Sequence, residues 1–127
     1  MIKLWIDDIR PMPEAFTHHC LNASSAIEFI QNNATNIVAI SLDHDLSEFN
    51  KNGEELTGNT VAQFIEESLY FNNVSFPNSV DFYIHSSNPT GRKNIIATIN
   101  NASNYTTSKF SIFDTPYETY YMAKKES

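Results

Sequence analysis

Short apolar runs alternate along this chain with longer segments in which apolar residues recur every three or four positions. The runs at 2–6, 37–42 and 80–84 predict strands. The second of these is β-branched and apolar on both faces, which is typical of a central strand in a parallel sheet. Two weaker runs, 15–21 and 110–113, predict a short second strand and a last strand.

Helical periodicity marks three segments. We expect one helix from a cap at Asn22 or Ser24 to about residue 32, a second that opens at Thr57-Gly58-Asn59-Thr60, and a third that begins at Pro89. The predicted buried faces are Ala26, Ile27, Phe29 and Ile30; Val61, Phe64, Ile65 and Leu69; and Ile95, Ile96 and Ile99.

Two segments show neither the apolar run of a strand nor the periodicity of a helix. Pro11 and Pro13 restrict the backbone and predict a stiff loop where a helix would otherwise follow the first strand. The polar segment 47–56 predicts an irregular surface loop. From Tyr117 onward the pattern is typical of no single element.

Strands that alternate with helices predict a parallel sheet covered on both faces, which is a three-layer α/β sandwich. A length of 127 residues fits one domain, 1–127. In such folds, ligands bind beyond the carboxyl ends of the strands.

Three of the predicted strands end in ionisable or hydrogen-bonding residues: Asp7-Asp8, Asp43-His44-Asp45 and His85-Ser86. If the sheet is parallel, all three ends lie at one rim. Carboxylates that converge there repel one another unless a cation neutralises them or one takes a proton. The sequence therefore predicts a site at this rim.

Oxygen-rich sites suit Mg²⁺ or Mn²⁺. The candidate metal ligands are Asp7, Asp8 and Asp43, with Asp45 as a further one. The imidazoles of His44 and His85 would favour Mn²⁺ as a ligand set, or would serve as general acid or base.

An anion site is also predicted, where Pro89-Thr90-Gly91 opens the third helix and leaves backbone N–H groups free. Arg92 or Lys93 would add a charged contact to a phosphate. Ser86 and Asn88 would donate hydrogen bonds to it. Each feature also has a purely structural interpretation, as a strand end or a helix cap, and the histidines at 18 and 19 are interpreted as surface residues.

The net charge of the chain limits which molecules it is expected to bind. Eight Lys and Arg against 15 Asp and Glu give a net charge of −7, which argues against salt-sensitive binding to the backbone of duplex DNA. The single cysteine, Cys20, suits a reducing compartment. No apolar run approaches the roughly 20 residues that span a bilayer, and no membrane partner is expected. We therefore expect a cytoplasmic protein.

Four ordered motifs resemble the cyclic-phosphate processing receiver domain family: LWIDDIRP at 4–11, ISLDHDL at 40–46, Thr57-Gly58, and HSSNPTGRKNI at 85–95. The resemblance covers the chain from its N-terminus to about residue 100. It implies the receiver-like, flavodoxin-like fold of response regulators, with the first helix shortened or lost. It also implies processing of cyclic phosphate ends, a role inferred for the family from association with RNA-repair enzymes.

By position, Asp7 and Asp8 match the acidic pair that binds Mg²⁺ in receivers. Asp43 matches the aspartate that receivers phosphorylate, and Ser86 their hydroxyl residue after the fourth strand. The lysine that follows the fifth strand of receivers has no counterpart, since Phe113-Asp114-Thr115-Pro116 stands there. Plain phosphotransfer signalling is therefore not the expected function.

The leading hypothesis is a metal-dependent enzyme acting on a phosphate ester, such as a cyclic phosphate of an RNA end or a nucleotide. The roles are metal binding by Asp7, Asp8 and Asp43; proton transfer by His44 or His85; orientation of a histidine, or metal binding, by Asp45; and phosphate binding by Ser86, Asn88, Gly91 and Arg92. Asp43 is alternatively a nucleophile. The other hypotheses are a non-catalytic module that binds or sequesters a nucleotide or phosphate, and a degenerate receiver that regulates a protein partner.

Overall fold

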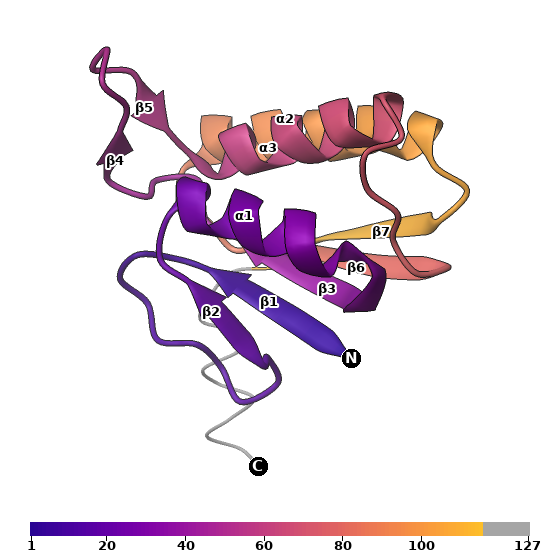
Figure 1. Cartoon of the computed structure of the whole chain (residues 1–127). Coiled ribbons are helices and arrows are strands. Elements are labelled where there is room, and N and C mark those ends of the chain that lie inside the picture. Colours follow the sequence, from indigo (N-terminus) through magenta and orange to yellow (C-terminus); the bar gives the residue numbers. More distant parts are fainter. Residues whose placement is uncertain (116–127) are drawn as a thin grey trace.

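A five-stranded parallel sheet organises the chain (Figure 1). The computed structural model describes residues 1–115. The strands, in the spatial order β2-β1-β3-β6-β7, are β2 (His18–Cys20), β1 (Ile2–Ile6), β3 (Ile37–Leu42), β6 (Ser79–Ile84) and β7 (Lys109–Asp114). Every neighbouring pair is parallel. This is the order 2-1-3-4-5 of flavodoxin-like and receiver folds.

Each of the three helices begins at a side chain that caps its first turn. They are α1 (Ala23–Asn33), α2 (Gly58–Tyr70) and α3 (Pro89–Ala102), and short 3-10 turns, Ala34–Asn36 and Ser103–Tyr105, follow α1 and α3. The caps are Asn22, Thr57 and Asn88, whose side-chain oxygens accept hydrogen bonds from backbone N–H groups of the first turn. None of these helices is long and apolar enough to cross a membrane.

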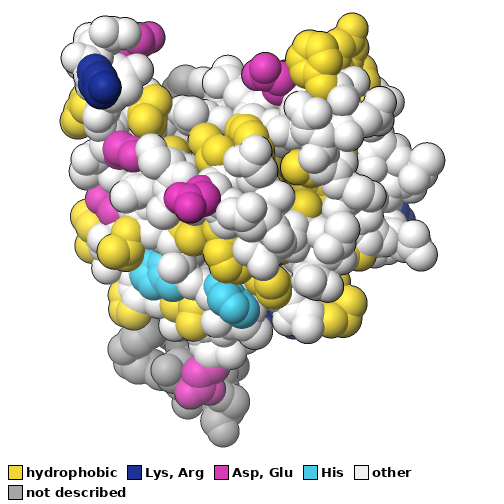
Figure 2. Space-filling model, viewed as in Figure 1, with side chains coloured by type: hydrophobic (Ala, Val, Ile, Leu, Met, Phe, Trp, Pro, Cys, Tyr) yellow, Lys and Arg dark blue, Asp and Glu magenta, His cyan; other side chains and the backbone are white. Residues whose placement is uncertain are grey.

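Acidic side chains are scattered over the side of the molecule seen in Figure 2, and basic side chains are sparse there. This distribution agrees with the net charge of −7. No extended basic stripe of the kind that tracks a nucleic-acid backbone crosses this view.

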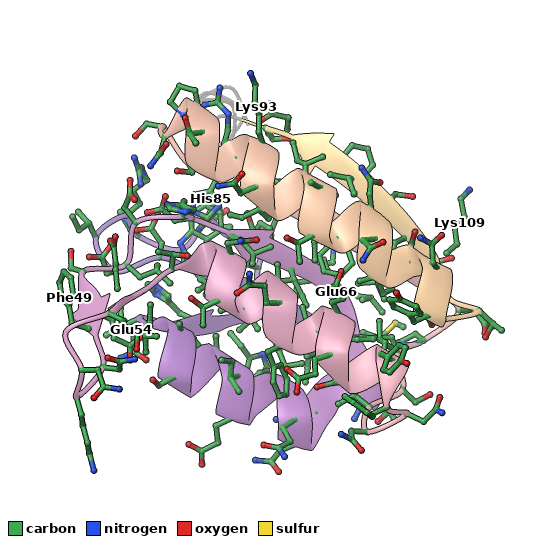
Figure 3. All side chains as sticks on the ribbon, turned by 90° about the horizontal axis from the view of Figure 1, so that it is seen from above. Phe49, Glu54, Glu66, His85, Lys93 and Lys109 are labelled. Atoms are coloured by element: carbon green, nitrogen blue, oxygen red, sulfur yellow. The ribbon has the colours of Figure 1, made fainter. Side chains whose placement is uncertain are left out.

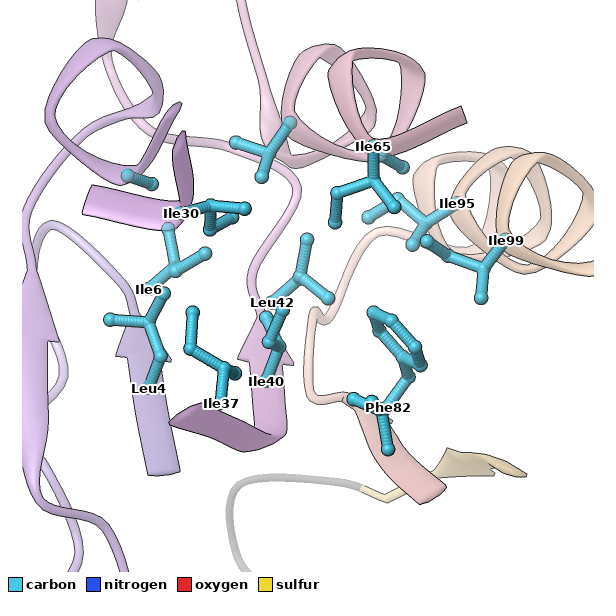
Figure 4. Close-up of a cluster of buried hydrophobic side chains, with 14 of the residues drawn as sticks. Leu4, Ile6, Ile30, Ile37, Ile40, Leu42, Ile65, Phe82, Ile95 and Ile99 are labelled. Atoms are coloured by element: carbon cyan, nitrogen blue, oxygen red, sulfur yellow. The ribbon is translucent and has the colours of Figure 1, made fainter. Parts of the chain in front are cut away.

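The core lies between the helices and one face of the sheet. Seen from above, α1, α2 and α3 lie side by side over the strands (Figure 3). Alternate strand residues point toward them and meet the apolar faces of the helices (Figure 4). The fully buried residues labelled there are Leu4, Ile6, Ile30, Ile37, Ile40, Leu42, Ile65, Phe82, Ile95 and Ile99. Each such side chain contributes about 1.5–3 kcal/mol by its burial.

A loop, rather than a helix, covers the opposite face of the sheet within residues 1–115. Phe16, at the end of the Pro11–Pro13 loop, packs edge-on against Trp5 at a centroid distance of 5.2 Å and against Tyr83 at 6.0 Å. Trp5 is fully buried as a result. The predicted fold class is confirmed: a receiver-like α/β fold with a mainly parallel sheet, in which the first helix is lost.

Most predicted elements agree with the structure to within one or two residues, but two do not. The second strand is shorter than 15–21, because Phe16 closes a turn onto Pro13 and only His18–Cys20 pair with β1. The segment predicted as an irregular loop contains a small hairpin, β4 (Glu48–Phe49) and β5 (Glu55–Leu56). The tail from Tyr117 lies outside the described residues.

The turn of this hairpin explains the error. The side chain of Asn50 accepts hydrogen bonds from the backbone N–H groups of Asn52 and Glu54, and Gly53 has a φ of +78°. An Asn-Gly pair is a strong hairpin signal. The flanking strands are polar and only two residues long, so the hydrophobic pattern did not reveal them. Glu48 ties the hairpin to the start of α1, accepting hydrogen bonds from the N–H groups of Ala23 and Ser24.

Candidate functional site

The predicted rim exists, and it gathers three carboxylates. Asp7 and Asp8 follow β1 and Asp43 follows β3, and each offers one oxygen within 4.8 Å of the others. Since β1 and β3 are adjacent and parallel, with Ile6 opposite Leu42, their carboxyl ends lie side by side. His85 follows β6 and lies near the ends at which α2 and α3 begin (Figure 3). The structure thus brings together the residues that three separate motifs supply.

Asp7 is the most completely bonded residue of the site. One carboxylate oxygen accepts hydrogen bonds from the backbone N–H groups of Ile9 and Arg10, both at 2.9 Å. The other accepts from Nε2 of His85 at 2.9 Å and from the Arg10 guanidinium at 3.2 Å. Burial alone would raise the pKa of Asp7, but the hydrogen bonds from His85 and the two backbone groups outweigh it and lower the pKa to about 2.

His85 is buried and supports Asp7 by a hydrogen bond. Because a carboxylate only accepts, the Nε2–H of His85 is the donor to Asp7. Its Nδ1 lies 2.7 Å from the hydroxyl of Ser41, and its ring stacks on Trp5 at 3.9 Å and 9°. The side chain has no solvent exposure. Both ring nitrogens are therefore used inside the protein, and His85 could reach a ligand only by breaking buried hydrogen bonds.

The pKa of Asp43 is shifted in the opposite direction to that of Asp7. Its oxygens accept hydrogen bonds from the backbone N–H of His44 at 2.8 Å and from the Arg10 guanidinium at 3.2 Å. Burial raises the pKa of Asp43, and repulsion from the Asp7 carboxylate raises it further. The electrostatic interaction with His85, hydrogen bonding with Ser86 and the charge of Arg10 lower the pKa, but they offset this rise only in part. The positive charge around Asp43 therefore does not fully stabilise its ionised form.

Asp8 supplies the clearest sign of a cation site. Its Oδ1 is buried and has no hydrogen-bond partner among residues 1–115. A buried carboxylate oxygen without a partner is costly, and a divalent cation is the group that would satisfy it. Three converging carboxylate oxygens are also the donor set that Mg²⁺ and Mn²⁺ prefer. The residues present therefore fit the predicted metal.

A second histidine faces outward beside this cluster. Nδ1 of His44 lies 2.9 Å from a carboxylate oxygen of Asp45, and the amide nitrogen of Asn88 donates to the same carboxylate at 3.3 Å. The ring rests on Gly91, where any Cβ would overlap it. Nε2 of His44 makes no hydrogen bond to the described part of the chain, and 15% of the side chain is exposed. This arrangement orients an imidazole and leaves one nitrogen for a ligand.

The predicted phosphate ligands lie at the rim, but most of their polar atoms already have partners. Oδ1 of Asn88 accepts from the N–H of Gly91 at 2.9 Å, which uses that N–H for the helix cap. The Arg92 guanidinium donates to the carbonyl of Ser86 at 2.8 Å and pairs with Asp114 at 3.3 Å. Arg92 therefore ties β6 to β7, and Lys93, the alternative, points away from the body of the molecule (Figure 3).

Gly58 brings the start of α2 against the loop after β3. A Cβ at this position would overlap the carbonyl oxygen of Asp43, and the Gly58 N–H donates to the carbonyl of His44 at 2.9 Å. The Thr57 side chain caps the same turn, as predicted. The Thr57-Gly58 motif thus holds the backbone of two candidate site residues in place.

Sequence reasoning missed three residues of this site: Arg10, Trp5 and Ser41. Arg10 lies inside the first motif, but nothing local shows that its side chain folds back onto two aspartates. Ser41 was visible as a lone polar residue in an apolar central strand. That signal could have identified a buried hydrogen bond at the end of β3.

The sequence model of one family, described as the cyclic-phosphate processing Receiver domain, matches residues 2–101. The chain belongs to this family. No curated protein and no solved structure matches it significantly. The matched segment of this cyclic-phosphate processing receiver domain contains every candidate site residue, from Asp7 to Arg92, whereas β7 lies beyond it.

Proposed function

We propose that this receiver domain hydrolyses a phosphate ester with the help of a divalent metal ion, and that its substrate is a cyclic phosphate of an RNA end or a nucleotide. The observation that carries the proposal is the buried oxygen of Asp8, which has no hydrogen-bond partner within residues 1–115, in a cluster of three carboxylates. Membership in a cyclic-phosphate processing family supports the substrate class.

Asp7, Asp8 and Asp43 would hold Mg²⁺ or Mn²⁺. The bound ion would polarise the phosphate and stabilise the charge that develops on its oxygens. His85 and Ser41 hold the buried side of Asp7, so this carboxylate is oriented before a ligand arrives. The raised pKa of Asp43 also supports a metal ion at this place. A positive charge added to that of Arg10 would favour the ionised form of Asp43.

His44 is the better of the two candidates for proton transfer. Its Nδ1 is bonded to Asp45, which fixes the ring, and its Nε2 makes no hydrogen bond within residues 1–115. In hydrolysis, Nε2 takes a proton from the attacking water as the water oxygen bonds to phosphorus. The bond from phosphorus to one sugar oxygen breaks, and that oxygen takes a proton from solvent. A positioned base of this kind contributes about 10²–10⁴-fold to the rate.

The alternatives are a domain that binds a nucleotide or phosphate without turnover, and a degenerate receiver that regulates a protein partner. The first would also need groups that contact the phosphate, and Asn88 and Arg92 are already engaged inside the protein. The degenerate receiver is disfavoured by the position of the lysine of β7. Receivers carry a lysine after their fifth strand, whereas Lys109 begins β7 opposite Ser79 and lies at the far end of the sheet from Asp43.

The test is hydrolysis of 2′,3′-cyclic mononucleotides, cyclic dinucleotides and RNA with a cyclic-phosphate end, each with Mg²⁺ or Mn²⁺. We expect metal-dependent turnover by the wild type, none by Asp43→Asn, and unchanged turnover by the control Lys109→Ala. Binding of a substrate without turnover would support the sequestering alternative. Labelling of Asp43 by a small phosphate donor, without hydrolysis, would support the degenerate receiver.

A further inference from the structure

Arg10 bridges two carboxylates of the cluster, those of Asp7 and Asp43. One guanidinium nitrogen, Nη1, lies 3.2 Å from Oδ2 of Asp7 and 3.2 Å from Oδ2 of Asp43. The backbone of the same residue is anchored, since its N–H donates to Asp7 and its carbonyl accepts from the indole N–H of Trp5 at 3.2 Å. The side chain, by contrast, is 29% exposed. A fixed backbone thus carries a charged group that can leave the carboxylates.

Counting hydrogen bonds shows what a divalent cation must displace. A carboxylate offers about four lone-pair sites. Those of Asp7 are filled by the N–H groups of Ile9 and Arg10, by the His85 ring and by the Arg10 guanidinium. The two backbone donors and the buried ring cannot withdraw without unfolding the loop or exposing the core. The guanidinium is the one donor of these four that belongs to a partly exposed side chain.

We propose that Arg10 is a resident counter-ion that releases Asp7 and Asp43 when a divalent cation binds, and that its guanidinium then binds the phosphate of the ligand. This inference rests on the proposed function, because it needs a cation and a phosphate at the same rim. It assigns the phosphate contact to a residue outside the anion site at the start of α3.

The other arginine of the chain supports this assignment. Arg92 is held by the Ser86 carbonyl and by Asp114. Arg10 starts within reach of Asp43, beside which the ligand phosphate would lie. A guanidinium freed from two carboxylates presents paired N–H donors, and phosphate accepts them in the same bidentate geometry as a carboxylate.

The exchange makes the two ligands cooperative. Without a divalent cation, Arg10 is bound to carboxylates, and the remaining negative charge repels a phosphate. With the cation, the same guanidinium becomes available. Cation and phosphate must then raise each other's affinity by the same factor, since such coupling is reciprocal.

Trp5 provides a reporter for the experiment. It is the only tryptophan of the chain, it stacks on His85, and its indole N–H donates to Arg10. We would titrate Mg²⁺ into the wild type, Arg10→Ala and the charge control Lys109→Ala while following Trp5 fluorescence. Calorimetry would then measure the affinity for inorganic phosphate, with and without saturating Mg²⁺. Arg10→Gln, which keeps the length and a donor, replaces Arg10→Ala if the latter does not fold.

We expect Mg²⁺ to bind Arg10→Ala roughly tenfold more tightly than the wild type, because two charge-assisted hydrogen bonds need not break. The factor by which Mg²⁺ raises phosphate affinity should be about tenfold smaller in Arg10→Ala than in the wild type. Lys109→Ala should match the wild type in both. An Arg10 that acted only as a nearby positive charge would leave this factor unchanged.

Three results would overturn the inference: an unchanged or weaker Mg²⁺ affinity in Arg10→Ala, an equal enhancement of phosphate binding in both proteins, or equal phosphate affinity in both. If Mg²⁺ binds neither the wild type nor Arg10→Ala, the proposed function fails and takes this inference with it. If Mg²⁺ binds both proteins equally, the inference alone fails.

Discussion

The site has two halves that differ in how well their polar groups are satisfied. The inner half consists of Asp7, His85, Ser41 and Trp5, where every carboxylate oxygen and ring nitrogen has a partner and no side chain is open to solvent. The outer half consists of Asp8, Asp43, His44 and Asp45. There, within the described residues, Oδ1 of Asp8 is buried without a hydrogen-bond partner, and the His44 side chain is partly exposed.

The carboxylates of the two halves have pKa values shifted in opposite directions. Neighbouring carboxylates whose environments push their pKa values apart are typical of sites with an assigned acid–base role. Asp7 has a pKa lowered to about 2 and Asp43 a raised pKa, although both end adjacent strands. The hydrogen bonds of the inner half therefore fix the orientation of Asp7, a candidate metal ligand, and the outer half keeps unsatisfied groups for a ligand. Changes in the outer half should alter function, and changes in the inner half should alter stability.

The largest effect is expected from His44→Gln. Losing the outward nitrogen should lower turnover of a cyclic phosphate substrate by about 10²–10⁴-fold, because a positioned base is removed. The free energy of unfolding should change by only about 1 kcal/mol or less, since the hydrogen bond lost at Nδ1 goes to the exposed Asp45 carboxylate. Steady-state kinetics and urea unfolding measure the two quantities. Equal turnover by His44→Gln and the wild type would remove the distinction between the two histidines.

His85→Ala should act on stability. It leaves the Asp7 carboxylate and the Ser41 hydroxyl buried without a partner and removes the stacking on Trp5. We expect the free energy of unfolding to fall by about 3 kcal/mol. Urea unfolding followed by circular dichroism measures it, with His44→Ala as the matched control. A loss below that of His44→Ala would contradict the supporting role of His85.

Acid should remove the contribution of Asp7. Its pKa is lowered in the folded protein from 3.8 to about 2, so the folded state favours the ionised carboxylate. The contribution, about 2 kcal/mol, is complete above the unfolded pKa near 4 and disappears as the pH falls through about 2. Unfolding free energies of the wild type and Asp7→Asn, measured from pH 5 to pH 2, test this. Their difference should shrink on acidification, and a constant difference would refute it.

Among the effects on stability, that of Asp43→Asn should be the smallest, and its sign should be opposite to that of the others. A raised folded-state pKa means that the folded protein disfavours the ionised carboxylate. Its contribution to stability therefore falls as the pH rises from the unfolded pKa through the folded one. At pH 7 without divalent cations, the variant should be more stable than the wild type by roughly 0.5–2 kcal/mol. Thermal unfolding in a chelating buffer measures the difference. Destabilisation by this substitution would place Asp43 in the inner half.

Local pattern was sufficient for the main elements and for the position of the rim. The run 37–42 predicted β3 to the residue, and Asn22, Thr57 and Pro89 marked the starts of the three helices. It was insufficient for the hairpin at Glu48–Leu56, whose strands are too short and too polar for periodicity to show. There the Asn-Gly turn was the informative signal.

The sequence by itself determined that acidic residues and histidines follow three parallel strands, because period and capping are local properties and parallel strands share one rim. Only the tertiary structure decided which of these groups are satisfied. Partners such as His85 for Asp7, or Arg10 for Asp43, are separated by 78 and 33 residues. Burial, hydrogen-bond saturation and pKa depend on those distant partners, so Asp7 and Asp43, identical residue types at the same rim, have pKa values shifted in opposite directions.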